Sequence, residues 1–158
     1  MFRANRRSGF TLVEVLIVVV IMAVLAATII PQFTDASGDA KVSSGKTNIG
    51  TVRSVLALYK AQHNGNFPAN STTVSLEASL TSKTTAAGVI DATNGIYGPY
   101  LQELPGDPFV SVKTVTNSTA SPLAAPAANT TSGGYNYNAT TGEIRFNYNT
   151  TQFPAHTY

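Results

Sequence analysis

The chain has 158 residues, a formal net charge of +2 and no cysteine, and only 11% of its residues are charged. This length leaves room for one domain with an appendage, and the lack of cysteine excludes disulfides and any zinc or redox site built on thiols. The positive charge is localised. Without residues 1–9, which hold three arginines, seven basic residues face eight acidic ones, and no basic stretch remains that would bind a nucleic acid.

The first thirty residues combine a basic tail, a small residue and a long apolar run. A signal peptide carries its small-residue cleavage site after the apolar core, whereas here the candidate, Gly9, precedes it. A cut between Gly9 and Phe10 would leave the apolar segment, residues 10–30, on the mature chain and create an amine at Phe10. As a helix this segment would be about 31 Å long, close to the roughly 30 Å hydrocarbon core of a bilayer. The preceding arginines predict a single-pass segment whose N-terminus is cytoplasmic.

Glu14 is the one ionisable side chain of the apolar segment. A charged residue at the bilayer centre costs about 2.5–3.5 kcal/mol on insertion scales, and less near the edge. A simple signal anchor has no use for such a residue, whereas an assembling segment could pair it with the Phe10 amine of a neighbouring copy. An unpaired charge is heavily penalised in a low dielectric, so this pair would set the register between copies.

The run from Gly9 to Glu14, Gly-Phe-Thr-Leu-Val-Glu, resembles the class III signal of type IV pilins and type II secretion pseudopilins. The resemblance implies a prepilin peptidase that cuts after a leader of residues 1–9 and methylates the new amine of Phe10. It also implies that copies of the chain polymerise through the apolar helix into a helical filament, with Glu14 as the assembly residue.

Pro31 closes the apolar run, and two interpretations fit it. A proline inside a helix removes one hydrogen bond and clashes with the preceding turn, so the helix could end there. The pilin-like family instead implies a long helix that continues and bends at Pro31. Five downstream apolar residues at helical spacing favour continuation: Ile49, Val52, Val55, Leu56 and Tyr59.

We therefore expect one helix from about residue 11 to residue 62, amphipathic over residues 31–62. Gly38, Gly45 and Gly50 each weaken a helix by roughly 1 kcal/mol, and the helix is expected to be least secure between Pro31 and Lys46. The polar cluster that begins at His63 should end the helix, with Gly65 as the candidate C-cap.

Two further stretches narrow the resemblance to the major pseudopilin of type II secretion systems. Residues 64–68 read Asn-Gly-Asn-Phe-Pro, and residues 98–109 contain Gly-Pro-Tyr-Leu and Leu-Pro-Gly-Asp-Pro-Phe. The chain departs from the family pattern at Phe109, where Trp is usual, and at Val110, where Gly is usual. Gly-Asp-Pro is typical of turns, so Asp107 is interpreted as a turn residue rather than a catalytic one.

The family's C-terminal loop also carries acidic calcium ligands. After Asp107 this chain has a single acid, Glu143, whereas calcium takes about six to eight oxygen ligands, usually with several carboxylates. His63 and His156 are isolated in the sequence and suggest neither a metal site nor a catalytic triad. We therefore expect no metal, no cofactor and no enzymatic activity.

Residues 63–158 are expected to form a globular α+β head. Residues 114–134 contain no charged residue and predict a flexible or extended loop. Residues 135–149 predict a hairpin, because apolar and polar residues alternate along its second strand. The hairpin should cover the C-terminal half of the long helix. The fold class is thus α+β, a pilin fold in which a long N-terminal helix packs on a small antiparallel β-sheet.

The sequence favours a structural subunit of a type II secretion pseudopilus. It should reside in the inner membrane with a periplasmic head. Its partners would be the prepilin peptidase, copies of itself, minor pseudopilins and the inner-membrane assembly platform, but no nucleic acid. One alternative is a type IV pilin for adhesion, motility or DNA uptake, which the lack of cysteine disfavours and the lack of calcium ligands favours. The other is a membrane-anchored binding protein or enzyme that does not polymerise.

Overall fold

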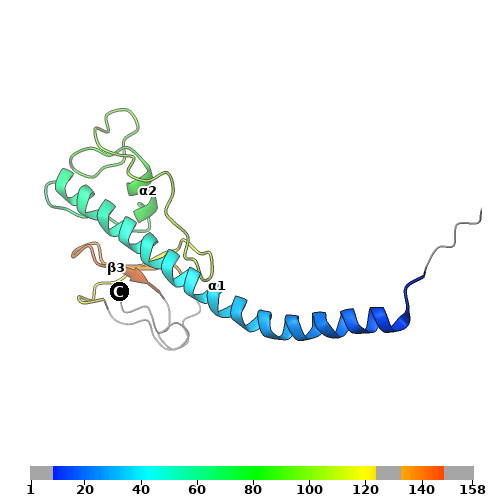
Figure 1. Ribbon diagram of the computed structural model, residues 1–158. Helices are drawn as coiled ribbons and strands as arrows, with labels where there is room; N and C mark the ends of the chain where they lie inside the picture. The colour runs from blue at the N-terminus through cyan, green and yellow to red at the C-terminus, as the bar shows by residue number, and fades with distance from the viewer. Residues whose placement is uncertain (1–8, 124–132, 148–158) are drawn as a thin grey trace, which may run out of the picture. The chain divides into compact units, whose positions relative to one another are not determined.

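The computed structural model describes residues 9–123 and 133–147; for residues 31–35 it describes the backbone alone. The chain forms two compact units, Met1–Ala40 and Lys41–Tyr158. The first contains the N-terminal part of a long helix. The second contains the rest of that helix and the globular head (Figure 1).

Helix α1 comprises Leu12–Gln62, 51 residues, and confirms the predicted helix within one residue at its start. The backbone is helical at residue 31 and beyond, so the interpretation that the helix ends at Pro31 is wrong. The bend at Pro31 stays a prediction. The helix ends as expected: Gly65 adopts a positive φ of 84°, and its N–H donates to the carbonyl of Lys60 at 3.0 Å.

The sheet has three strands, β1 (Val115–Asn117), β2 (Tyr135–Tyr137) and β3 (Ile144–Phe146), in the order β1-β2-β3. Strands β2 and β3 form the predicted antiparallel hairpin, with Tyr137 opposite Ile144. The end of the predicted hairpin, residues 148–149, lies outside the described residues.

The sheet is mixed rather than antiparallel throughout, because β1 pairs with β2 in parallel. A parallel pair needs a crossover connection of a dozen or more residues. The chain between Asn117 and Tyr135 provides one. This pairing also corrects the prediction for residues 114–134, since the stretch contains a strand and is not a loop along its whole length.

The core lies in the second unit, where one face of α1 packs against the head. The helix contributes four of the five apolar residues that the sequence placed on that face, buried to 4% exposure or less, and Val55 is partly buried against them. Helix α2 (Leu76–Thr81) and the hairpin provide the opposing side. The fully buried members of the core cluster are Ile49, Val52, Leu56, Tyr59, Leu76, Leu80, Leu104, Tyr135, Tyr137 and Ile144.

Two buried tyrosines of the hairpin form hydrogen bonds to the loops that contain Pro68 and Pro105. The hydroxyl of Tyr135 donates to the carbonyl of Pro105 at 2.7 Å, and that of Tyr137 donates to the carbonyl of Pro68 at 2.8 Å. Each buried phenol therefore has the partner that a buried polar group needs. The predicted cover of the helix by the hairpin is confirmed.

Candidate processing and assembly site

The predicted cleavage point lies directly in front of α1. Gly9 and Phe10 are both exposed, Phe10 to 88%, and the helix begins two residues later at Leu12. Gly9 has open space around the position where a side chain would begin. The backbone at this junction is therefore accessible and non-helical, which is what a peptidase needs in order to bind an extended chain.

Glu14 is held by Thr11 in a capping box. One carboxylate oxygen, Oε2, accepts hydrogen bonds from the Thr11 backbone N–H at 2.8 Å and from the Thr11 hydroxyl at 2.9 Å. The Glu14 N–H lies 3.2 Å from the Thr11 hydroxyl oxygen. This reciprocal arrangement satisfies two N–H groups that the first turn of a helix leaves without a partner.

The capping box leaves the second carboxylate oxygen of Glu14 available. Among the described residues, Oε1 accepts no hydrogen bond, whereas Oε2 takes both donors from Thr11. A cut between Gly9 and Phe10 would not disturb this geometry, because Thr11 keeps its amide. In the uncut chain, the hydrogen bonds of the Glu14 carboxylate among the described residues are to Thr11 and not to Phe10.

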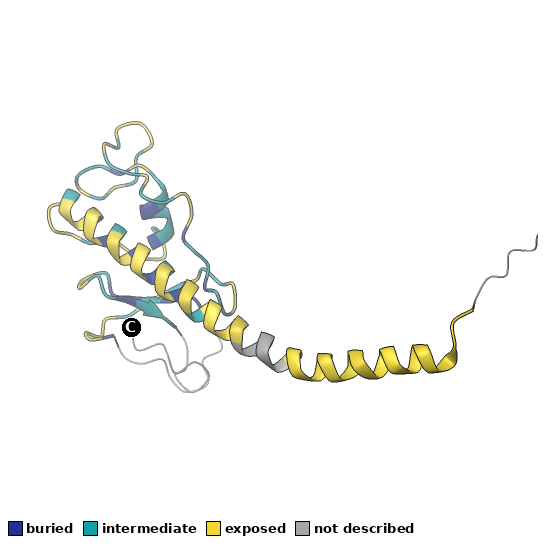
Figure 2. Cartoon of the chain, viewed as in Figure 1, coloured by how far each residue is buried: buried dark blue, intermediate teal, exposed yellow. Residues whose placement is uncertain are grey.

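The segment that follows Glu14 is apolar on every side. Among the described residues, Leu12–Ile30 is the one helical stretch long and apolar enough to cross a membrane, with a mean hydropathy of 3.0. All of its side chains are exposed (Figure 2). A helix that is apolar all round is buried either in a large core or in a membrane, and no described residue of the chain covers this stretch.

Asp107, in the second sequence signature, is a buried turn residue. Its Oδ1 accepts hydrogen bonds from the N–H groups of Phe109 at 2.7 Å and Val110 at 3.3 Å, which confirms the turn interpretation. Its Oδ2 accepts from the N–H of Gly134 at 2.9 Å. This second bond, which the sequence did not suggest, ties the turn to the residue that precedes β2.

His63 is buried to 1% exposure, an environment that its polar neighbours in the sequence did not indicate. Its ring stacks on Tyr59 with the centroids 3.7 Å apart. Nδ1 lies 2.8 Å from the Tyr59 carbonyl, which can only accept, so Nδ1 donates there, and Nε2 lies 2.9 Å from the Thr84 hydroxyl oxygen. Every polar atom of the ring is satisfied, and His63 acts as a core residue.

Sequence reasoning missed two features of these sites that a local pattern could have signalled. Thr11 stands three residues before Glu14, the spacing of a capping box. The i,i+4 spacing of Tyr59 and His63 places both rings on one helix face. In the described part of the chain, no three His, Asp or Glu residues gather in a group that could hold a metal ion.

Comparison with known proteins places these features in a family. Residues 4–30 match the prokaryotic N-terminal methylation motif, and residues 32–139 match the type II secretion system (T2SS), protein G. The type II secretion system core protein G of Pseudomonas aeruginosa is 39% identical over 105 residues, which cover 66% of this chain and 70% of that protein. Its counterpart in Vibrio cholerae is 32% identical over 109 residues, 69% of this chain and 70% of that protein.

Type IV pilins are also similar. The type IV major pilin protein PilE1 of Neisseria gonorrhoeae is 30% identical over 112 residues, 71% of this chain but 54% of the pilin. No solved structure matches the chain significantly.

The methylation motif and the exposed apolar helix define a membrane-anchored protein of the pilin-like class. Within that class, the chain belongs to the family of type II secretion system protein G. The resemblance to the major pseudopilin and the α+β pilin fold predicted from the sequence are both confirmed.

Proposed function

We propose that the chain is a structural subunit of a type II secretion pseudopilus. It is made as a precursor, cut between Gly9 and Phe10 by a prepilin peptidase and methylated at the new amine of Phe10. The observation that carries the proposal is the order of features at the N-terminus: an exposed Gly9–Phe10 junction, the Thr11–Glu14 capping box and an apolar helix without cover. Family membership supports the same function.

Assembly proceeds through the apolar half of α1. The free oxygen of Glu14 pairs with the Phe10 amine of a neighbouring copy, since an α-amine is largely protonated at neutral pH. Methylation keeps that charge. The pair fixes the axial register of two helices, because any other register leaves a carboxylate unpaired among apolar side chains.

The subunit resides in the inner membrane with its N-terminus in the cytoplasm and its head in the periplasm. Three arginines in residues 1–9 precede an apolar segment that contains no basic residue, and they support this orientation. Its further partners are the minor pseudopilins and the inner-membrane assembly platform. Its work is mechanical, and it needs no nucleic acid and no catalytic residue.

The head folds without calcium. Among the described residues, three backbone N–H groups donate to the Asp107 carboxylate, so this side chain already fastens the turn that precedes β1. Treatment of the purified full-length chain with a chelator should leave its melting temperature unchanged. A fall of several degrees would show a metal site that contributes to stability.

Mass spectrometry of the N-terminus tests the processing step. The native chain should begin with N-methylated Phe10, and Gly9→Leu should retain residues 1–9, because a bulky side chain obstructs the peptidase. A normal Phe10 N-terminus in the Gly9→Leu variant would contradict the proposed recognition of the glycine.

Deletion of the gene separates the pseudopilus from a surface pilus, the alternative that the pilin relatives favour. Loss of secreted proteins with unchanged surface filaments is expected. Loss of surface filaments with normal secretion would assign the chain to a type IV pilus instead.

A further inference from the structure

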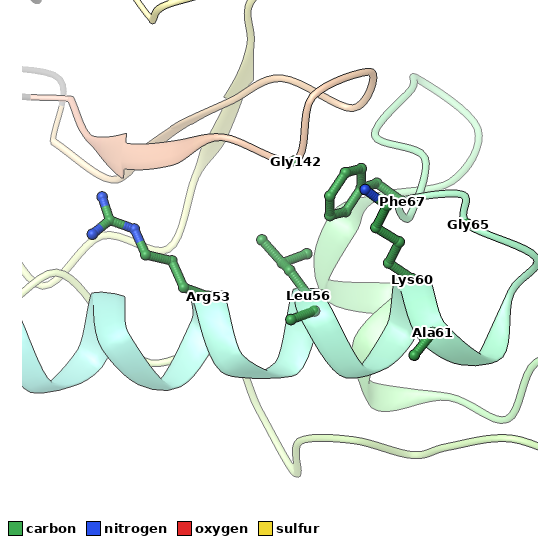
Figure 3. Close-up of a pocket in the computed structure, with 8 residues that line it drawn as sticks. Arg53, Leu56, Lys60, Ala61, Gly65, Phe67 and Gly142 are labelled. Carbon is green, nitrogen blue, oxygen red and sulfur yellow. The ribbon is translucent and has the colours of Figure 1, made fainter.

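A groove of about 570 Å³ lies on the C-terminal half of α1, beneath the turn of the β2–β3 hairpin (Figure 3). Its apolar floor is formed by Leu56, Ala57 and Ala61 of the helix and by the ring of Phe67. The two alanines are exposed, so nothing in the described part of the chain covers the floor at these positions. An apolar side chain could enter from outside.

Two cations, Arg53 and Lys60, flank this floor one heptad apart on the helix. Arg53 donates from Nη2 to the carbonyl of Ile144 at 3.1 Å, and Nζ of Lys60 lies 4.6 Å from the centroid of the Phe67 ring. Neither forms an ion pair with a described carboxylate, and residues 41–62 contain four cations and no acid. The groove therefore fits an apolar ligand that also bears negative charge.

A loop on the same head complements the groove, because it exposes apolar side chains and a carboxylate. Residues 89–96 expose two large apolar side chains, Val89 to 61% and Ile96 to 70%, on either side of Asp91. The loop is fixed at its base, because Thr84 bridges to both Ile90 and Tyr97. The apolar side chains are thus presented on an anchored turn rather than on a free strand.

Asp91 supplies the negative charge. Its Oδ1 accepts from the N–H groups of Asn94 at 2.9 Å and Thr93 at 2.8 Å, and its Oδ2 accepts from the Asn94 side-chain amide at 3.0 Å. These donors, the Asn94 N–H first, lower the pKa of the carboxyl below its ordinary value. A carboxylate offers about four acceptor positions, so Asp91 can still accept a bond from a cation.

The loop and the groove lie on different flanks of the helix. The loop side contacts Tyr59 and His63, since the Thr84 hydroxyl binds His63 and the Tyr97 ring meets the His63 ring at 5.2 Å. The groove lies on the side of Lys60 and Ala61, next to the hairpin. Figure 1 shows the loops after α2 and strand β3 on opposite sides of α1. One head therefore presents the loop and the groove in different directions.

We propose that the loop 89–96 of one copy docks in the groove of a neighbouring copy. Ile96 and Val89 cover the apolar floor, and Asp91 faces Arg53 and Lys60. The contact is heterologous, and a heterologous contact that does not close into a ring propagates as a helical filament. The proposal rests on the proposed pseudopilus function and deepens it by naming a head-to-head contact in addition to the apolar helix.

Cysteine cross-linking of the full-length chain tests this contact, because the native chain contains no cysteine. A chain with both Ala57→Cys and Ile96→Cys should form a ladder of disulfide-linked oligomers under mild oxidation in assembled filaments. The matched control combines Leu58→Cys with Ile96→Cys. Leu58 is 49% exposed but about 100° further around the helix, away from the groove, and should give little ladder.

Charge substitutions at Ile96 provide a second readout that does not depend on disulfide geometry. Ile96→Lys and Ile96→Glu remove the same apolar contact, but only lysine meets like charges in the groove. We expect the filament yield of Ile96→Lys to be about tenfold below that of Ile96→Glu, and Lys60→Glu to restore it in the Ile96→Lys background.

The outcomes separate this contact from the proposed function. Filaments in normal amount without the 57–96 ladder, or equal yields for the lysine and glutamate variants, would overturn the docking and leave the pseudopilus intact. Absence of filaments from the unaltered chain would overturn the proposed function and the docking with it.

Discussion

The two halves of α1 belong to one helix but have opposite surroundings. In the first half, Leu12–Ile30, every side chain is apolar or small except Glu14 and Thr28, and every side chain is exposed. In the second half, Ile49, Val52, Leu56 and Tyr59 are buried on one stripe, and the remaining faces are exposed.

This difference shows that the apolar side chains of the two halves are covered by different partners. The second half has a stripe that its own head can cover, so its stability is a property of the single chain. The first half has apolar side chains on all sides, and one small sheet cannot cover them. Its cover has to be a membrane or other copies, and the proposed assembly residue, Glu14, lies in this half.

The largest expected effect concerns the packed half. Leu56→Ala should lower the free energy of unfolding by about 3 kcal/mol, because a fully buried leucine leaves a cavity. Leu58→Ala, two positions away and 49% exposed, should change it by less than about 0.5 kcal/mol. Chemical denaturation of the full-length variants in detergent measures both. Equal effects would mean that the stripe is misassigned.

A smaller loss of folding free energy is expected at Asp107, whose carboxylate joins the turn before β1 to Gly134. Asp107→Asn keeps the shape of the side chain but turns an NH₂ group toward one of its N–H partners. The variant should lose about 2 kcal/mol, since a buried N–H without an acceptor carries that order of penalty. An unchanged unfolding midpoint would show that the bond to Gly134 contributes nothing.

Alkaline pH should weaken the head and leave the helix of the first half unaffected. Burial raises the pKa of Tyr135 from 10.0 to about 12, and burial also raises that of Tyr137. Above pH 10 the unfolded chain releases these protons while the folded chain retains them, so stability falls as pH rises from about 10 to 12. The free energy of unfolding falls by at most about 1.4 kcal/mol per pH unit for each tyrosine.

Thermal unfolding measured between pH 8 and 12 tests this dependence. Tyr135→Phe should reduce the slope above pH 10, because it removes one of the phenols whose pKa is raised by burial. A slope that is the same with and without the Tyr135 hydroxyl would contradict the assignment.

The smallest effect compares two helix glycines. Gly50→Ala, with open space at the new methyl group, should stabilise the helix by about 1 kcal/mol. At Gly45 the added Cβ would lie 3.3 Å from the Phe146 ring and 3.4 Å from Pro108. Gly45→Ala should not give this stabilisation, because the Phe146 ring and Pro108 lie close to the helix at this point. Equal melting temperatures for the two variants would contradict a close approach at Gly45.

Most of the fold was predictable because its determinants are local. The 3.6-residue period of Ile49 to Tyr59 predicted the helix and its buried face, and the alternation around Ile144 predicted the hairpin. Strand β1 was not predictable in the same way. Its three residues, Val115–Asn117, are exposed or partly exposed, and they form a strand only through pairing with residues twenty positions later.

The candidate site shows the same division between local and distant information. Gly9, Phe10 and Glu14 could be singled out because they lie in a contiguous stretch that matches the N-terminal methylation motif. The second bond of Asp107 and the burial of His63 depend on Gly134 and Thr84, which are far away in the sequence. The groove likewise joins α1 to Phe67 and the hairpin turn, and no single stretch of sequence reveals it.

The central claim is that the charge of Glu14, and not its helix-capping bond alone, drives assembly. Filament yield of full-length Glu14→Ala and Glu14→Gln in cells tests it most directly. Glutamine keeps the capping box but carries no charge, whereas alanine removes both. The account predicts that both variants are processed, remain in the membrane and form at least about tenfold fewer filaments. Normal filaments from Glu14→Gln would contradict it.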